Sequence, residues 1–150
     1  MTKTIRRMLS LVMALAICLS FALSVSASSD SRTAGIYGFI HGYCAQDELE
    51  PHILNTTTRV TRNPDGAYLK TQAEYYERET PLPSDAAISQ AGDKILTQDL
   101  TIFVTIEGIP DTAYVNHHVC DVNDEGVEEI KYSAFTYTSV EFESMEEWEQ

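Results

Sequence analysis

The chain is poor in positive charge. It has ten lysine and arginine residues against 23 aspartate and glutamate residues. Three of the ten, Lys3, Arg6 and Arg7, precede a hydrophobic run. The rest of the chain has seven basic and 23 acidic residues, which gives a net charge of −16. Nucleic acids and anionic membranes both need a basic face on their partner, so we expect the protein to bind neither.

The sequence also lacks the short motifs of common enzyme active sites. It contains no G-x-S-x-G motif, no H-E-x-x-H motif and no glycine-rich phosphate loop. Carboxylates are abundant, and that abundance makes any single pair uninformative as a glycosidase site. We therefore expect a protein without catalytic activity and keep a small secreted hydrolase as a further alternative.

Long hydrophobic runs are absent except at the N-terminus. Residues 8–25 are apolar apart from three serines, they follow a basic segment, and Val25-Ser26-Ala27 matches the small-residue pattern that signal peptidase cleaves. Residues 1–27 are therefore predicted to be a secretory signal peptide of the bacterial general secretion pathway. We expect the mature chain to be extracellular, with no stable membrane insertion after cleavage.

Cysteine is scarce, because only Cys44 and Cys120 remain after residue 27. An even pair in an exported chain predicts one disulfide. The bridge would close a loop of about 77 residues and stabilise the fold by about 4.5 kcal/mol in the chain-entropy model. Two free thiols are the alternative, which an oxidising compartment disfavours.

Convincing long helices are also missing, and alternating patterns dominate instead. Six segments are predicted to be strands: 36–45, 53–62, 67–78, 100–107, 113–122 and 130–142. The fold class expected is all-β, a six- to seven-stranded antiparallel sandwich or barrel with a Cys44–Cys120 disulfide. An immunoglobulin-like layout fits the cysteine spacing, but His118 replaces the corner tyrosine and the only tryptophan is Trp148.

The segments between the strands complete the expected organisation. Residues 28–35 are predicted to be a flexible N-terminus, 36–143 a single β domain, and 144–150 an acidic tail, with a short terminal helix left open. The NPDG turn at 63–66 predicts that 53–62 and 67–78 form a hairpin. Residues 79–98 are expected to be irregular, with one or two helical turns over 85–91.

The richest stretch in reactive side chains is AYVNHHVCDVNDEG at 113–126. Adjacent strand residues point to opposite faces, so His117 and His118 cannot bind one metal from a regular strand. Asp121, Asn123 and Glu125 resemble the start of a calcium loop, but Tyr132 stands where the closing glutamate is required. We expect a hairpin turn here and no cofactor, with a weak extracellular calcium site at these three residues left open.

Eight tyrosines offer a functional indication. Tyrosines exposed on strands make good recognition surfaces, and Tyr75, Tyr76 and Tyr137 are the candidates. The leading prediction is an extracellular binding or interaction module whose partner is an extracellular protein or a glycan. A secreted toxin-like or bacteriocin-like effector is the alternative, and it would require an exposed apolar patch such as one around Phe142, Met145 and Trp148.

Overall fold

The computed structural model describes residues 27–106 and 108–142, and these build two antiparallel sheets. The first sheet has the order β1-β2-β3-β7, formed by β1 (Ala27–Thr33), β2 (Phe39–Gln46), β3 (Ile53–Val60) and β7 (Ile95–Thr101). The second has the order β5-β4-β8-β9, formed by β4 (Tyr68–Glu77), β5 (Thr80–Pro81), β8 (Thr112–Val122) and β9 (Glu128–Ser139). A further strand, β6 (Asp85–Ile88), also pairs with β4, and a 3₁₀ turn, η1 (Gly35–Tyr37), joins β1 to β2.

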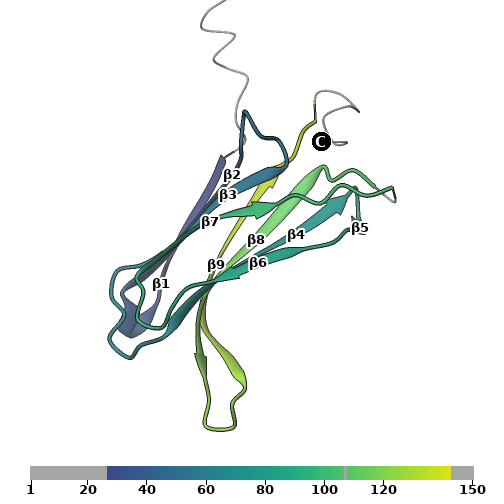
Figure 1. The fold of residues 1–150 in the computed structure, drawn as a ribbon. Coiled ribbons are helices and arrows are strands. Elements are labelled where there is room, and N and C mark those ends of the chain that lie inside the picture. Colours follow the sequence, from purple (N-terminus) through teal and green to yellow (C-terminus); the bar gives the residue numbers. More distant parts are fainter. Residues whose placement is uncertain (1–26, 107, 143–150) are drawn as a thin grey trace, which may run out of the picture.

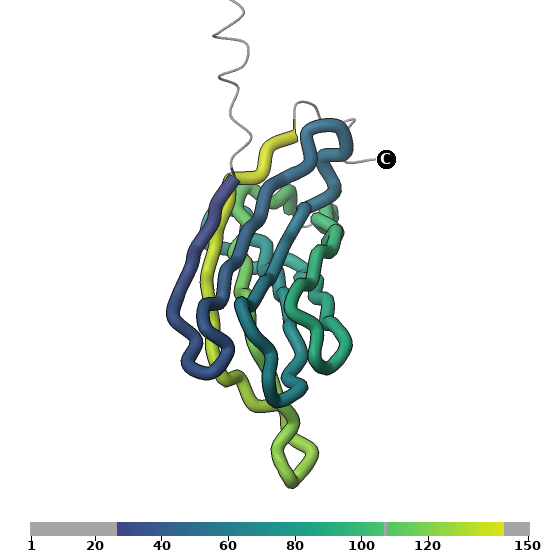
Figure 2. Tube along the Cα trace, turned by 90° about the vertical axis from the view of Figure 1, so that its left-hand side faces the viewer, coloured from purple at the N-terminus to yellow at the C-terminus, as the bar shows by residue number. Residues whose placement is uncertain are grey.

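The two sheets lie face to face, and the hairpin of β8 and β9 projects beyond them (Figure 1). At one side β1 and β9 run next to each other, as the tube view shows (Figure 2). There Asp30 accepts a hydrogen bond from the backbone N–H of Phe135 at 3.0 Å, and the Ser28 hydroxyl accepts one from the N–H of Tyr137 at 3.4 Å. Side chains of β1 thus satisfy edge groups of β9, which would otherwise be free to pair with another chain.

Strict alternation along the long strands creates the core. On β4 the residues Leu69, Ala73 and Tyr75 are fully buried, and on β8 the same holds for Ala113, Val115 and Val119. Successive side chains point to opposite faces of a strand, so each of these sequences buries one face and leaves the other outside. The strands predicted over 67–78 and 113–122 are confirmed.

The all-β class is confirmed, but the predicted hairpin is wrong. Segments 53–62 and 67–78 do form strands, yet β3 pairs with β2 and β7, while β4 pairs with β5, β6 and β8. The NPDG connection therefore carries the chain from one sheet to the other. The two strands face each other across the core, where the hydroxyls of Thr58 and Thr71 lie 2.5 Å apart.

Two further segments differ from expectation. Residues 28–33, expected to be flexible, form β1 together with Ala27, and β1 pairs with β2 from Ala27 opposite Ala45 to Thr33 opposite Phe39. A ladder of backbone hydrogen bonds needs no apolar side chains, so the polar composition of this segment did not reveal the strand. Residues 85–88, expected within a helical segment, form β6 because β4 offers them an unpaired edge.

The predicted disulfide is absent, and both cysteines are free and buried. Cys44 points from β2 into the core. Cys120 lies on the outer face of β8, because Val119 next to it occupies an inner position and successive side chains alternate. The side chains therefore point to different sides of the second sheet, and no bridge between them is compatible with this arrangement.

The immunoglobulin-like layout is not found either. That layout pairs its first two strands in one sheet and passes the third to the other. Here β1, β2 and β3 pair consecutively in one sheet. The predicted signal peptide, up to residue 26, and the acidic tail at 144–150 lie outside the described residues.

Candidate functional site

The outer face of the second sheet gathers side chains from three strands that are distant in sequence. Strand register places Glu74 of β4, Tyr114 of β8 and Tyr137 of β9 in one row across the sheet. The next row holds Gln72, Asn116 and Phe135. Tyr76 lies above the first of these rows on β4, so this half of the face is dominated by aromatic rings.

The four rings contact one another around Tyr114. The centroid of Tyr114 lies 5.4 Å from that of Tyr76 in an edge-to-face arrangement, 5.9 Å from Phe135 with nearly parallel planes, and 6.3 Å from Tyr137. Exposed fractions are 37% for Tyr114, 42% for Phe135 and 61% for Tyr137. We call Tyr76, Tyr114, Phe135 and Tyr137 the aromatic face. Such contacts hold the rings in place while much of their surface stays in water.

Polar groups without partners stand beside the aromatic face. Among the described residues, the side chains of Gln72, Glu74 and Asn116 make no hydrogen bond or ion pair, and all three are half-buried. A half-buried amide or carboxylate satisfied only by water is available to a ligand. Rings and free polar groups together are typical of a recognition surface.

The other half of the same face is polar and internally satisfied. Lys70 donates to Glu128 at 2.9 Å, the Tyr68 hydroxyl donates to the same carboxylate, and His118 Nδ1 lies 2.6 Å from Ser133 Oγ. Burial, and then the Lys70 charge, lower the pKa of His118. The polar side chains of this half are therefore bonded to one another. Fewer of them are free to bind a ligand than beside the aromatic face.

A serine beside a histidine invites a hydrolase interpretation of Ser133 and His118. Acyl transfer also needs backbone donors aimed at the developing oxyanion. Strand β8 pairs with β4 on one side and β9 on the other around His118, so its N–H groups are used in the ladders. Burial also raises the pKa of the nearby Cys120 thiol to about 11, which disfavours a thiolate nucleophile there.

Of the three tyrosines predicted to form a recognition surface, two lie on the aromatic face and one does not. Tyr76 and Tyr137 belong to the aromatic face, but Tyr75 does not, because its side chain is fully buried in the core. Tyr75 and Tyr76 are adjacent on β4, so alternation must send them to opposite faces. Sequence reasoning missed Tyr114 and Phe135, although the period of two places Tyr114 with Asn116 and Phe135 with Tyr137.

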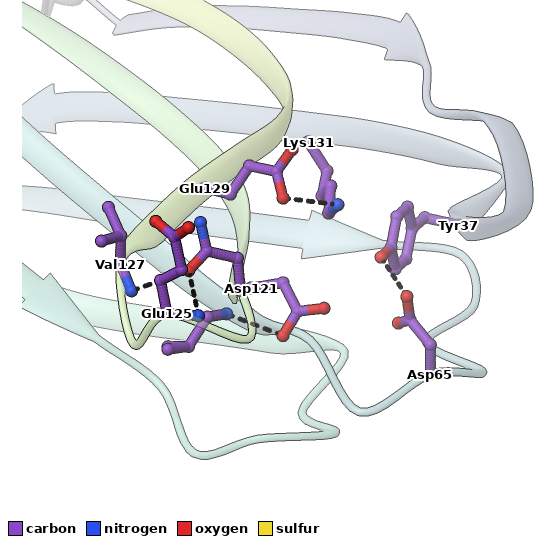
Figure 3. A network of polar contacts seen from close by, with 9 residues as sticks. Tyr37, Asp65, Asp121, Glu125, Val127, Glu129 and Lys131 are labelled. Atoms are coloured by element: carbon purple, nitrogen blue, oxygen red, sulfur yellow. Dashed lines mark hydrogen bonds and ion pairs between the residues drawn. The ribbon is translucent and has the colours of Figure 1, made fainter.

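The acidic turn between β8 and β9 uses its side chains locally (Figure 3). The Asn123 side-chain oxygen accepts the backbone N–H groups of Glu125 and Val127, each at 3.0 Å, and Asp121 accepts that of Val122 at 2.8 Å. Within residues 27–106 and 108–142, no group of three or more His, Cys, Asp or Glu side chains is arranged to hold a metal ion. These bonds account for the turn as a hairpin connection.

A polar layer crosses the interior. His117 Nδ1 lies 2.7 Å from Thr58 Oγ1 and His117 Nε2 lies 2.8 Å from Thr136 Oγ1. Thr58 continues to Thr71, and Thr136 to the Cys44 thiol. On each contributing strand the layer separates the two apolar clusters of the core, as Leu69, Thr71 and Ala73 illustrate on β4. Burial lowers the pKa of His117 to about 4, so the ring is neutral at neutral pH.

The two histidines therefore occupy opposite faces of β8, as alternation predicted. His117 is part of the polar layer and His118 is on the outer face next to Ser133.

In the part of the chain that the structure describes, no helix has the length and apolar character needed to cross a membrane.

Comparison with known proteins identifies no relative of this chain. No protein-family model matches it, and neither a curated protein nor a solved structure is significantly similar to it.

Proposed function

We propose that the mature chain acts outside the cell as a binding module, without catalysis and without a cofactor, and that the aromatic face is its binding surface. The observation that supports this most strongly is the cluster of Tyr114 with the exposed rings of Phe135 and Tyr137, with three unpartnered polar side chains beside them. Aromatic residues are enriched in the energetically dominant parts of interfaces. The signal-peptide pattern at 1–27 supports export.

The arrangement of the rings on one sheet favours binding by preformed geometry. Tyr114 lies in the middle of three paired strands, and each ring neighbour comes from a strand of the same sheet. A preformed surface loses little conformational entropy when a ligand binds.

The effector alternative has less support. It required a patch around Phe142, Met145 and Trp148, of which the last two lie outside the described residues. Phe142 itself is half-buried and packs against His52, with ring centroids 5.3 Å apart.

Capture by immobilised mature protein tests the proposal. Cell-wall fragments, glycans and extracellular proteins are passed over wild type and over a Tyr137→Ser variant, which removes the most exposed ring of the face. We expect a ligand retained by wild type and released earlier by the variant. Equal retention of every captured ligand by both proteins would contradict the proposal.

A further inference from the structure

One charged side chain lies beside the aromatic face, and that charge is unpaired. Glu74 lies directly opposite Tyr114 in the β4–β8 register, and no described residue forms an ion pair with its carboxylate. Side chains opposite each other on paired strands have Cβ atoms about 5 Å apart. A group seated on the Tyr114 ring would therefore be within reach of the Glu74 carboxylate.

Two cations close to this face are already engaged by other carboxylates. Lys70, two rows away on the same strand, pairs with Glu128 at 2.9 Å. Arg32, which follows Asp30 near the Phe135 backbone, pairs with Asp30 at 2.7 Å. The carboxylate thus faces the ring cluster without an internal counter-charge.

Aromatic rings and a free carboxylate share a preference for one ligand chemistry. The faces of tyrosine and phenylalanine rings attract ammonium and guanidinium groups. A net charge of −16 on residues 28–150 adds a long-range field that steers cationic partners toward the protein and repels anionic ones. A neutral sugar would use the rings and the amides but would leave the Glu74 charge uncompensated.

We propose that the aromatic face binds lysine or arginine side chains of a basic segment in a partner protein. This inference rests on the proposed binding function and names its partner chemistry. The cation lies over Tyr114 and its neighbours and pairs with Glu74, while Gln72 and Asn116 bond to the polar backbone of the partner. Tyrosine and arginine are both enriched among the residues that dominate protein interfaces.

Titration of the mature protein with octalysine and octaarginine tests this, with octaglutamate and a neutral β-glucan oligosaccharide as comparators. We expect both basic peptides to bind and the comparators not to bind. Tyr114→Leu and Glu74→Gln should each weaken binding roughly two- to fivefold, and Tyr114→Phe should retain it because the ring remains. Raising the salt from about 0.02 to about 0.5 M should weaken binding further.

A matched control lies on the opposite sheet. Tyr43 on β2 is 37% exposed, as is Tyr114, so Tyr43→Leu removes an equally exposed ring elsewhere. We expect Tyr43→Leu to bind basic peptides like wild type. Circular dichroism of each variant confirms folding, and Tyr137→Ser provides a second test at a position that is 61% exposed.

The outcomes separate this inference from the proposed function. Basic peptides that do not bind, or that bind all variants equally, overturn the inference. If the oligosaccharide binds in a Tyr114-dependent way instead, or if sedimentation shows Tyr114-dependent self-association, the face still binds but its ligand is not cationic. If no captured ligand depends on Tyr114 or Tyr137, the proposed function fails as well.

Discussion

Gly42 and His117 fit together across the core: a Cβ added at Gly42 would overlap the imidazole ring of His117. The ring cannot swing aside freely, because Thr58 and Thr136 hold its two nitrogens from opposite sides. Gly42 is buried on β2, so its missing side chain provides the space that the polar layer needs where the sheets face each other.

This relationship predicts that Gly42→Ala lowers the free energy of unfolding by about 1–3 kcal/mol through overpacking. In a His117→Ala background the same change should cost less, giving a coupling energy of at least about 0.5 kcal/mol. Urea denaturation of the four proteins in the cycle measures it. Purely additive costs for Gly42→Ala and His117→Ala would contradict the account.

Burial of neutral His117 predicts a specific acid sensitivity. Its pKa is lowered to about 4 by burial, so the unfolded chain binds this proton more readily than the folded one. Stability from this group is complete above about pH 6.5 and declines as the pH falls toward 4, by on the order of 3 kcal/mol. Denaturant midpoints between pH 7 and pH 4 measure the decline.

The matched control for this pH dependence is the exposed His41. His41→Gln should keep the wild-type slope of stability against pH. Should His117→Gln be too unstable to compare, the His117 ring resonance in NMR provides the titration directly. A ring that titrates near pH 6.5 in the folded protein would refute the buried neutral state.

Free, buried thiols replace the expected disulfide, and this has a chemical consequence. Burial raises the pKa of both Cys44 and Cys120. Since the thiolate is the reactive form, we expect native protein to react slowly with a thiol reagent and unfolded protein to release two thiols per chain. Mass spectrometry of non-reduced protein checks the same point. A mass lower by two hydrogens, with no reactive thiol after unfolding, would show that the cysteines are bridged.

Calcium should have little effect on the hairpin turn, because the Asn123 side-chain oxygen is already used by two backbone N–H groups. We expect the melting temperature to stay nearly constant in millimolar calcium and to be the same for Asp121→Asn. A rise of several degrees that Asp121→Asn abolishes would instead assign a calcium site to Asp121, Asn123 and Glu125.

The alternating sequence pattern predicted which face of a strand a side chain occupies better than it predicted which strands pair with each other. Alternation separated His117 from His118, because side-chain direction is a local property of a strand. Which strands pair is decided by packing between distant segments. The NPDG turn was therefore compatible with a hairpin, although Thr58 and Thr71 meet across the core instead.

The candidate site was predictable only in part for the same reason. Tyr76 and Tyr137 stood out as strand tyrosines, but their common neighbour Tyr114 becomes central only when β8 lies between β4 and β9. The cysteine prediction failed on side-chain direction, since an expected export and an even count say nothing about which face Cys120 occupies.

Tyrosine nitration with and without the ligand retained in the capture experiment tests the central claim most directly. Tyr114 and Tyr137 are exposed on the aromatic face, and Tyr43 is exposed on the opposite sheet. If the aromatic face is the binding surface, the bound ligand protects Tyr114 and Tyr137 while Tyr43 is nitrated at its free rate. Protection of Tyr43 with unchanged nitration of Tyr114 and Tyr137 would place binding on the other sheet and contradict the account.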